Sequence, residues 1–283
     1  MSLLTGPDPY LLVESPEGEQ RWEHKRTTFV PPSDCFKASR AKAEVIPFRL
    51  AADFVATHHY SGAIGTCRLA VGLFYKPSPF ENDFLGGVAT FGNPIQPASI
   101  RSYFDGLDPS LGVEMNRLVL LDAIPFNGES FLIGRALRML RRKSPQLRGA
   151  LSYCDPMALY TADGRLAKRG HCGTVYRCTN AVYRGQSKPR IQYLNAEGRV
   201  VSERSISKLR LGEAGDDGMY RHLLALGAPE RRSDETVEDY IKRAMAEGPF
   251  RRQRHAGKNV FAWELGGPMT LLHGVVQDGR CRV

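Results

Sequence analysis

The chain has 283 residues, enough for one substantial hydrophobic core with a smaller appendage. It contains no apolar run of about 18 residues. It also lacks an N-terminal secretory signal, so we expect a cytoplasmic protein without a membrane partner. The net charge of +9 favours a polyanionic partner such as nucleic acid, although a solvated basic surface without a partner gives the same net charge.

Six cysteines are present, and none of them belongs to a CxxC pair. This spacing argues against a zinc ribbon. In a reducing cytoplasm we expect six free thiols. The cysteines are Cys35, Cys67, Cys154, Cys172, Cys178 and Cys281.

The middle of the chain alternates between helical and extended patterns. Apolar spacing over 46–60 predicts a helix, which Ser61-Gly62 ends. The apolar segments 69–75 and 84–91, separated by turn residues, predict an antiparallel hairpin. The loop 92–112 is long enough to be a functional insertion and is expected to carry a short helix. A strand at 114–122, a helix at 131–142 and a strand at 150–155 then predict a parallel unit with a right-handed crossover.

The remaining segments complete a mixed α/β fold. We expect a helix over 173–183, a hairpin of 191–194 with 199–202, a polar helix over 234–246, a basic run at 251–255 and a last strand near 259–264. This order predicts a central mixed β-sheet flanked by helices. The predicted domains are an irregular N-terminal extension (1–45), a catalytic core (46–205) and a basic C-terminal extension (206–283) packed on the core.

The loop before the 131–142 helix is a candidate cofactor site. The amides and the positive dipole end at a helix start can hold a phosphate, and a glycine permits close approach. An ordinary capped helix start has the same local sequence, and the local sequence alone favours that plain interpretation. The candidate cofactor residues are Leu118, Val119, Asn127, Gly128, Glu129 and Ser130.

Histidine, tyrosine and aspartate side chains lie at three turns and are candidates for catalysis. Imidazoles and phenols can act as acid or base or stack on a base, and a carboxylate at the carboxyl end of a strand lies where open α/β sheets place active sites. A solvated helix end, an aspartate capping a turn and an incidental histidine are the plain alternatives. The candidate catalytic residues are His59, Tyr60, Ser61, Tyr153, Asp155 and His171.

Basic residues cluster in several places and alternate with tyrosines. Phosphate contacts together with stacking side chains suit nucleic-acid binding, while a scattered solvated face is the alternative. The candidate DNA-binding residues are Arg184, Lys188, Arg190, Arg251, Arg252 and Arg254.

Four segments, taken in order after His59-Tyr60-Ser61, resemble the Mom family. They read EMNRLVL from 114, NGESFLIGRALR from 127, LSYCDP from 151 and GHCGTVYRCTN from 170. The resemblance covers the chain from about residue 45 to about residue 200, and it implies a GNAT-like acyltransferase fold. It further implies that the N6 amine of adenine in double-stranded phage DNA receives a methylcarbamoyl group, which protects the DNA from host restriction. The implied donor is acetyl-CoA or a related acyl-CoA, and iron is a second implied cofactor.

The resemblance brings the candidate catalytic residues to one flipped-out adenine. Tyr60 or Tyr153 would stack on the base, and Asp155 would accept the N6 proton or a hydrogen bond. His59 and His171 would act as bases or, with Asp155, as a two-histidine, one-carboxylate set that suits Fe(II). One departure concerns the donor: the usual acyltransferase signature Arg/Gln-x-x-Gly-x-Gly/Ala is reduced here to a single glycine, so a different donor or a degenerate donor site also fits.

Two other functions remain open from the sequence. A conventional N-acyltransferase acting on a small amine or a protein would turn over acetyl-CoA without DNA. A non-catalytic DNA-binding phage protein would bind DNA with strong salt dependence and leave no product. The basic clusters argue against the first, and the catalytic candidates argue against the second. The oligomeric state is not indicated.

Overall fold

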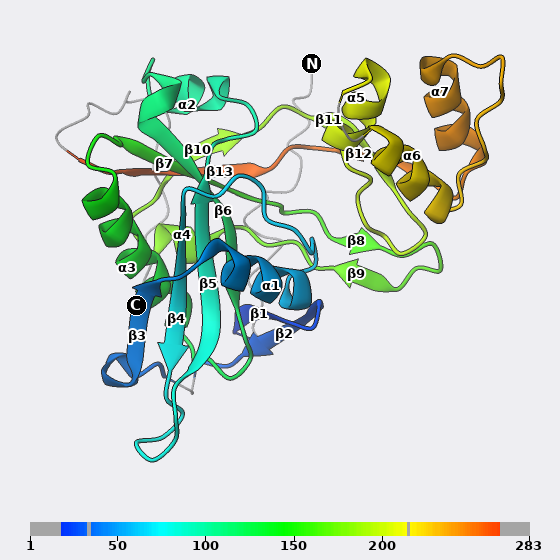
Figure 1. The fold of residues 1–283 in the computed structure, drawn as a ribbon. Coiled ribbons are helices and arrows are strands. Elements are labelled where there is room, and N and C mark those ends of the chain that lie inside the picture. The colour runs from blue at the N-terminus through cyan, green and yellow to red at the C-terminus, as the bar shows by residue number, and fades with distance from the viewer. Residues whose placement is uncertain (1–17, 33–34, 214–215, 267–283) are drawn as a thin grey trace, which may run out of the picture. The chain divides into compact units, whose positions relative to one another are not determined.

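A computed structural model of the chain divides it into two compact units (Figure 1). The structure describes residues 18–32, 35–213 and 216–266. The sheet unit consists of the described parts of Ser15–Tyr153, Gly173–Gly185 and Val260–Val283. The ribbon–helix unit consists of the described parts of Cys154–Cys172 and Gln186–Asn259. Among the described helices, none is long and apolar enough to span a bilayer.

A seven-stranded sheet forms the centre of the sheet unit, in the order β10-β13-β7-β6-β5-β4-β3. Strands β3 to β6 pair antiparallel, whereas β6 and β7 pair parallel and are connected in the chain by helix α3. This mixed sheet flanked by helices confirms the predicted fold class. The strands are β3 (Ala41–Val45), β4 (Leu69–Tyr75), β5 (Phe84–Gly92), β6 (Gly112–Leu120), β7 (Gly149–Cys154), β10 (Val182–Gln186) and β13 (Asn259–Glu264).

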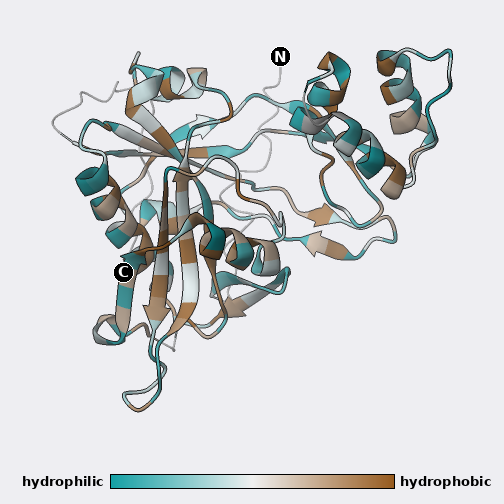
Figure 2. Cartoon of the chain, viewed as in Figure 1, coloured by the Kyte–Doolittle hydropathy of each residue, from teal (hydrophilic) through white to brown (hydrophobic). Residues whose placement is uncertain are grey.

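Helices cover both faces of this sheet because its strands alternate side chains between two apolar faces. Helix α1 (Phe48–His58) buries Phe54 and Val55 against Ala70 and Val88. Helix α3 (Gly128–Lys143) contacts β3 to β6, and its fully buried side chains follow helical spacing. The apolar residues along β4 and β5 can be followed in Figure 2. The shorter helices are α2 (Ala98–Tyr103) and α4 (Thr174–Arg177).

The N-terminal extension is more regular than predicted. Strands β1 (Glu19–Glu23) and β2 (Arg26–Val30) form an antiparallel hairpin. The two turn residues, His24 and Lys25, have φ values of 45° and 65°, as the two-residue turns that suit a hairpin require. Neither residue is the Asn or Gly that usually marks such a turn, so the sequence gives no signal for this hairpin.

The ribbon–helix unit contains two small β-ribbons and three helices with an apolar cluster of their own. Leu223, Tyr240 and Ala244 lie fully buried in this cluster. The predicted extension boundary at 205/206 falls inside α5. The elements are β8 (Leu159–Tyr160), β9 (Leu166–Lys168), β11 (Arg190–Leu194), β12 (Arg251–His255), α5 (Glu203–Leu211), α6 (Asp216–Ala225) and α7 (Val237–Glu247).

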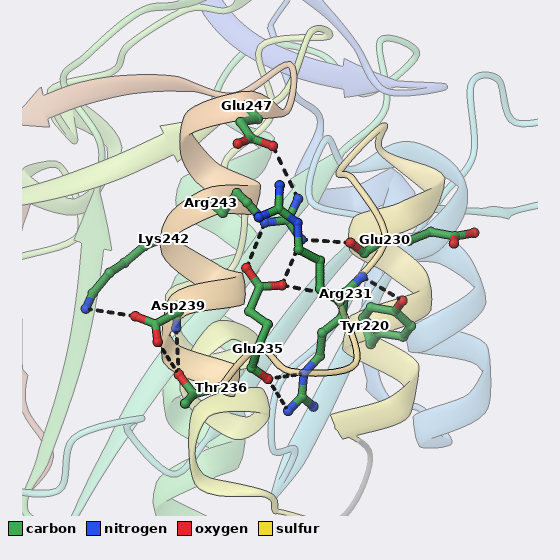
Figure 3. A network of polar contacts seen from close by, with 10 residues as sticks. Tyr220, Glu230, Arg231, Glu235, Thr236, Asp239, Lys242, Arg243 and Glu247 are labelled. Atoms are coloured by element: carbon green, nitrogen blue, oxygen red, sulfur yellow. Dashed lines mark hydrogen bonds and ion pairs between the residues drawn. The ribbon is translucent and has the colours of Figure 1, made fainter.

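An ion-pair network fixes α7 to the loop before it (Figure 3). Arg243 Nε and Nη2 each donate to the Glu235 carboxylate at 2.7 Å, and Arg243 Nη1 donates to Glu247 at 3.2 Å. At the helix start, the Thr236 hydroxyl accepts from the N–H of Asp239 at 3.2 Å, which satisfies one of the amides that a helix leaves open. The loop and helix are therefore held by one continuous set of contacts.

Two predicted elements differ from the structure. The helix predicted over 173–183 is a single turn, and Asn180 with φ of 65° ends it before β10 begins. Residues 191–194 do turn back at 195–198 and form one antiparallel bridge with the predicted partner segment, between Leu194 and Val200. Their full ladder, however, is with β12 rather than with 199–202. The basic run 251–255 is thus a strand.

Candidate functional site

Asp155 follows β7 and lies at the centre of a buried polar cluster in the ribbon–helix unit. Its Oδ1 accepts hydrogen bonds from His255 Nε2 and from the backbone N–H of Met157, each at 3.0 Å. Its Oδ2 lies 3.0 Å from the ammonium of Lys168, whose side chain is 4% exposed. Lys168 also donates to the carbonyl of Met157 at 3.1 Å. The cluster joins three separate segments of the unit.

This cluster holds Asp155 as an anion. Burial acts to raise the pKa of Asp155, but the hydrogen bond from His255 and the charge of Lys168 outweigh it and lower that pKa below its ordinary value. His255 Nδ1 accepts from the backbone N–H of Gly257 at 3.0 Å, so Nε2 carries the ring proton that is donated to Asp155. Asp155 is therefore a good hydrogen-bond acceptor and a weak proton acceptor.

His171 lies next to this cluster. Its backbone N–H donates to the carbonyl of Asp155 at 2.9 Å. Burial and the nearby charge of Lys168 lower the pKa of His171 to about 4, so its imidazole is neutral at pH 7 and can accept a proton. Burial raises the pKa of the Cys154 thiol, which argues against a thiolate nucleophile there.

In the sheet unit, His59, Tyr60 and Ser61 end α1 and pack against Trp22 of β1. The ring centroids of Trp22 and Tyr60 lie 4.9 Å apart, and those of His59 and Tyr60 lie 4.2 Å apart. The backbone N–H of Ser61 donates to His59 Nδ1 at 3.2 Å, and the Ser61 hydroxyl lies 2.7 Å from the same nitrogen. Because Nδ1 accepts, Nε2 carries the ring proton, which suits a hydrogen-bond donor better than a metal ligand.

Arg117 of β6 lies within electrostatic range of Tyr60 in this aromatic group. Burial lowers the pKa of Arg117, whereas the interactions with Tyr60 and Glu114 raise it. Glu114 also interacts with Tyr153 of β7, whose pKa burial raises to about 12 although its side chain hydrogen-bonds to Ser99. The Tyr153 phenol thus stays protonated at pH 7 and is a hydrogen-bonding rather than a basic group.

The first turn of α3, predicted to hold the donor's phosphates, contains carboxylates of the chain itself. The backbone N–H of Asn127 donates to Glu19 Oε2 at 2.7 Å. Arg21 pairs with both Glu19 and Glu129, and its own side chain is fully buried. Burial raises the pKa of Glu129 well above its ordinary value, although the Arg21 charge opposes this. These residues do not fit a diphosphate, which would have to displace the carboxylates.

The other predicted cofactor residues lie around this turn. Gly128 is buried, and Ser130 is half-buried. Val119 of β6 is buried in the apolar cluster under α1, whereas Leu118 beside it is half-buried. A role for any of them in donor binding stays a prediction.

The predicted iron site is not supported. Within residues 18–32, 35–213 and 216–266, no group of three or more His, Cys, Asp or Glu side chains could hold a metal ion. Both Asp155 oxygens already contact Lys168 or His255, and His59 Nδ1 contacts Ser61. We therefore derive no step through iron. No disulfide joins the five described cysteines, and Cys281 lies outside the described residues.

Five of the six predicted DNA-binding residues lie on or beside the β11–β12 ribbon. Their side chains are exposed, although Arg190 lies 3.5 Å from Glu203 and Arg251 donates to the carbonyl of Tyr160 at 2.9 Å. Residues two apart on a strand point to the same face, so Arg252 and Arg254 of β12 lie on one face of this ribbon. The sixth residue, Arg184, is half-buried on β10 in the sheet unit.

The structure brings together some predicted catalytic residues and adds others. Asp155 and His171 meet in the ribbon–helix unit, whereas His59, Tyr60, Ser61 and Tyr153 belong to the sheet unit. That all six meet at one adenine stays a prediction. The sequence did not indicate Lys168, His255 or Arg117 as candidates. Arg117 lies within the segment EMNRLVL that resembles the Mom family, so that resemblance could have indicated it. His255 follows a run of arginines, which gives no signal for a buried histidine.

Comparisons with known proteins point to one family. The sequence model of the Mom protein family matches residues 41–225. The methylcarbamoylase Mom of Escherichia phage Mu is 26% identical over 185 residues, which are 65% of this chain and 68% of that protein. His255 lies beyond the segment matched by the family, whereas Asp155 and Lys168 lie within it.

Two solved structures are similar at much lower levels. A tandem GNAT protein from the clavulanic acid biosynthesis pathway has a TM-score of 0.37 at 9% identity, covering 77% of this chain and 88% of that one. Malonyl-CoA decarboxylase from Agrobacterium vitis has a TM-score of 0.33 at 13% identity, covering 81% of this chain and 62% of that one.

Proposed function

Because the chain belongs to the Mom protein family, we propose that it modifies DNA by transferring a methylcarbamoyl-type group to the N6 amine of adenine. The family match over residues 41–225 is the observation that carries this proposal. The transferred group is inferred from the phage Mu relative, which is a methylcarbamoylase by name. Modified adenines would protect phage DNA from restriction.

The reaction forms a new C–N bond at N6, breaks the bond between the transferred carbon and the leaving group of its donor, and releases a proton from N6. The N6 lone pair is delocalised into the ring, so the base has to leave the stack and be held against the electrophile. Asp155 Oδ2 contacts one donor, Lys168, and a carboxylate oxygen has two acceptor positions, so it could accept a second hydrogen bond, from the N6 amine. Neutral His171 is the better proton acceptor, because the pKa of Asp155 is held low.

An acyl-CoA is the donor that the family resemblance implies, and it would supply an activated carbonyl when bound. The first turn of α3 does not fit its diphosphate, because Glu19 already accepts from the Asn127 amide. We therefore derive no step from that cofactor.

Arg252 and Arg254 are proposed to contact DNA phosphates. Each phosphate contact contributes about 0.9 to the slope of log affinity against log salt. The variant Arg252→Gln/Arg254→Gln is expected to reduce that slope for double-stranded DNA by about 1.8. Arg204→Gln is the matched control, because Arg204 pairs with Glu213 at 2.6 Å. An unchanged slope in the double variant would remove the ribbon from the DNA-binding surface.

The test of the function is mass spectrometry of nucleosides from plasmid DNA after expression of this chain in bacteria. A heavier deoxyadenosine is expected with the wild type and not with Asp155→Asn, and its mass identifies the group. Asp163→Asn is the matched control, because Asp163 is an exposed carboxylate of the same unit. Unmodified nucleosides from well-folded wild-type protein would refute DNA modification by this chain alone.

A further inference from the structure

The start of α3 is the place where a helix of this fold offers its unpaired amides to an anion. In this chain the N–H of Asn127 donates to the Glu19 carboxylate at 2.7 Å. The N–H of Gly128 donates to the carbonyl of Pro125 at 3.2 Å. Two amides at the start of this helix are thus engaged by groups of the chain.

Arg21 fixes these carboxylates in place. Its guanidinium donates to Glu19 at 3.1 Å and to Glu129, and it also donates to the carbonyls of Ile124 and Pro125 at 3.1 and 3.0 Å. The Arg21 side chain has no exposed surface. A cation that could otherwise attract phosphates is therefore buried and already matched by internal acceptors.

Space at this turn is filled as well. A Cβ atom added at Gly128 would lie 2.4 Å from a methyl carbon of Ile124 and 3.1 Å from one of Leu120. The glycine that could allow close approach of a phosphate is packed against apolar side chains instead. The carboxylate of Glu19, which pairs with Arg21, adds negative charge beside a site that would have to accept an anion.

The hairpin that carries Glu19 and Arg21 is an integral part of the core. Trp22, between them and the turn of the hairpin, is 9% exposed and belongs to the same apolar cluster as Phe54 and Val55 of α1. The backbone N–H of Lys25 donates to the carbonyl of His58 at 2.8 Å. Moving the hairpin away to admit a ligand would therefore unpack this cluster.

We infer that the β1–β2 hairpin permanently closes the N-terminus of α3 with an internal carboxylate, so that no nucleotide donor binds there through its phosphates. The disagreement is with the cofactor implied by the fold resemblance. It is independent of whether the acceptor is DNA, because it concerns only the donor's phosphates. A donor of this protein binds elsewhere or lacks a diphosphate.

The test uses acetyl-CoA as the probe with the full chain and without DNA. Hydrogen–deuterium exchange is followed over residues 124–131 with and without saturating acetyl-CoA, and binding is measured by calorimetry. We expect unchanged exchange over 124–131, with either no binding heat or protection of another segment. Slower exchange over 124–131 on adding acetyl-CoA would overturn the inference.

A charge variant provides the second measurement. Glu19→Gln removes the anion beside the Asn127 amide while keeping the side-chain volume, and Glu44→Gln on exposed β3 is the control. If phosphates bound at this turn, removing one adjacent negative charge would raise acetyl-CoA affinity about tenfold or more. We expect the affinity, or its absence, to be the same in wild type and both variants.

Discussion

Replacing Arg21 with methionine tests how much the buried guanidinium stabilises the sheet unit. Arg21 donates to Glu129, Glu19 and two backbone carbonyls from a fully buried position. Removing one partner of a buried ion pair costs about 3–5 kcal/mol, because the remaining polar groups lose their compensation. Methionine keeps much of the volume, so little of the effect comes from a cavity. We expect Arg21→Met to lower the free energy of unfolding by about 3–5 kcal/mol.

The partner in this pair is tested by a double-mutant cycle. In Arg21→Met/Glu129→Gln, the uncompensated carboxyl group is gone, so the double variant should be more stable than the sum of the single variants by about 0.5–3 kcal/mol. Urea unfolding followed by tryptophan fluorescence measures it, since both tryptophans, Trp22 and Trp263, lie in the sheet unit. Lys42→Met, which removes an exposed ion pair, is the control and should unfold like wild type. Additive single effects, or a wild-type-like Arg21→Met, would refute the account of a coupled buried pair.

Three further outcomes follow from the ribbon–helix unit. The hydrogen bond from Arg243 lowers the pKa of Glu235 to about 2 from 4.5. The contribution of this ion pair to the stability of the fold is therefore present above pH 4.5 and lost as the pH falls toward 2. The melting temperatures of wild type and Arg243→Met, followed by circular dichroism, should differ at neutral pH and converge near pH 2. Burial lowers the pKa of His171 to about 4, so the NMR titration of its imidazole should inflect near pH 4. The folded state should lose stability as the pH falls from 6.5 to 4, because only the unfolded chain binds the proton in that range. An inflection near pH 6.5 would contradict a buried imidazole. Leu223→Ala should destabilise the helical cluster by about 2–5 kcal/mol, seen as faster amide exchange in α7, and unchanged exchange there would count against a shared core.

The local sequence pattern was enough to predict the elements that have regular apolar spacing or clear turn residues at their ends. Strand β4 spans Leu69–Tyr75 as predicted, because an apolar run is bounded by turn residues on its carboxyl side. Strand β12 could not be read in this way, since RRQRH contains no apolar side chain and its partner β11 lies far away in sequence; Gln192 and Gln253 face each other across 61 residues. Pairing over such a distance depends on tertiary contacts that periodicity does not record.

The candidate site followed the same division. Asp155 and His171 could be predicted as candidates because each lies at a turn beside an element with a clear pattern. The structure joins these two residues by a backbone hydrogen bond. His255 was not found, since its meaning depends on facing Asp155 across 100 residues. At the first turn of α3 the local sequence permits an anion site, and only the tertiary structure brings the carboxylate of Glu19, 108 residues away, to the Asn127 amide.

The order of strands in the sheet has a consequence for the newly synthesised chain. Strand β13 lies between β10 and β7, yet it is the last of the seven to leave the ribosome. Until residues 259–264 emerge, β7 has an open edge of backbone donors and acceptors, and such edges are templates for aggregation. A chain that ended before Asn259 would retain every residue matched by the family model, but the edge of β7 would stay unpaired by β13 in the finished protein. Production of the protein in a host cell therefore depends on translation running through a short segment that carries none of the candidate catalytic residues.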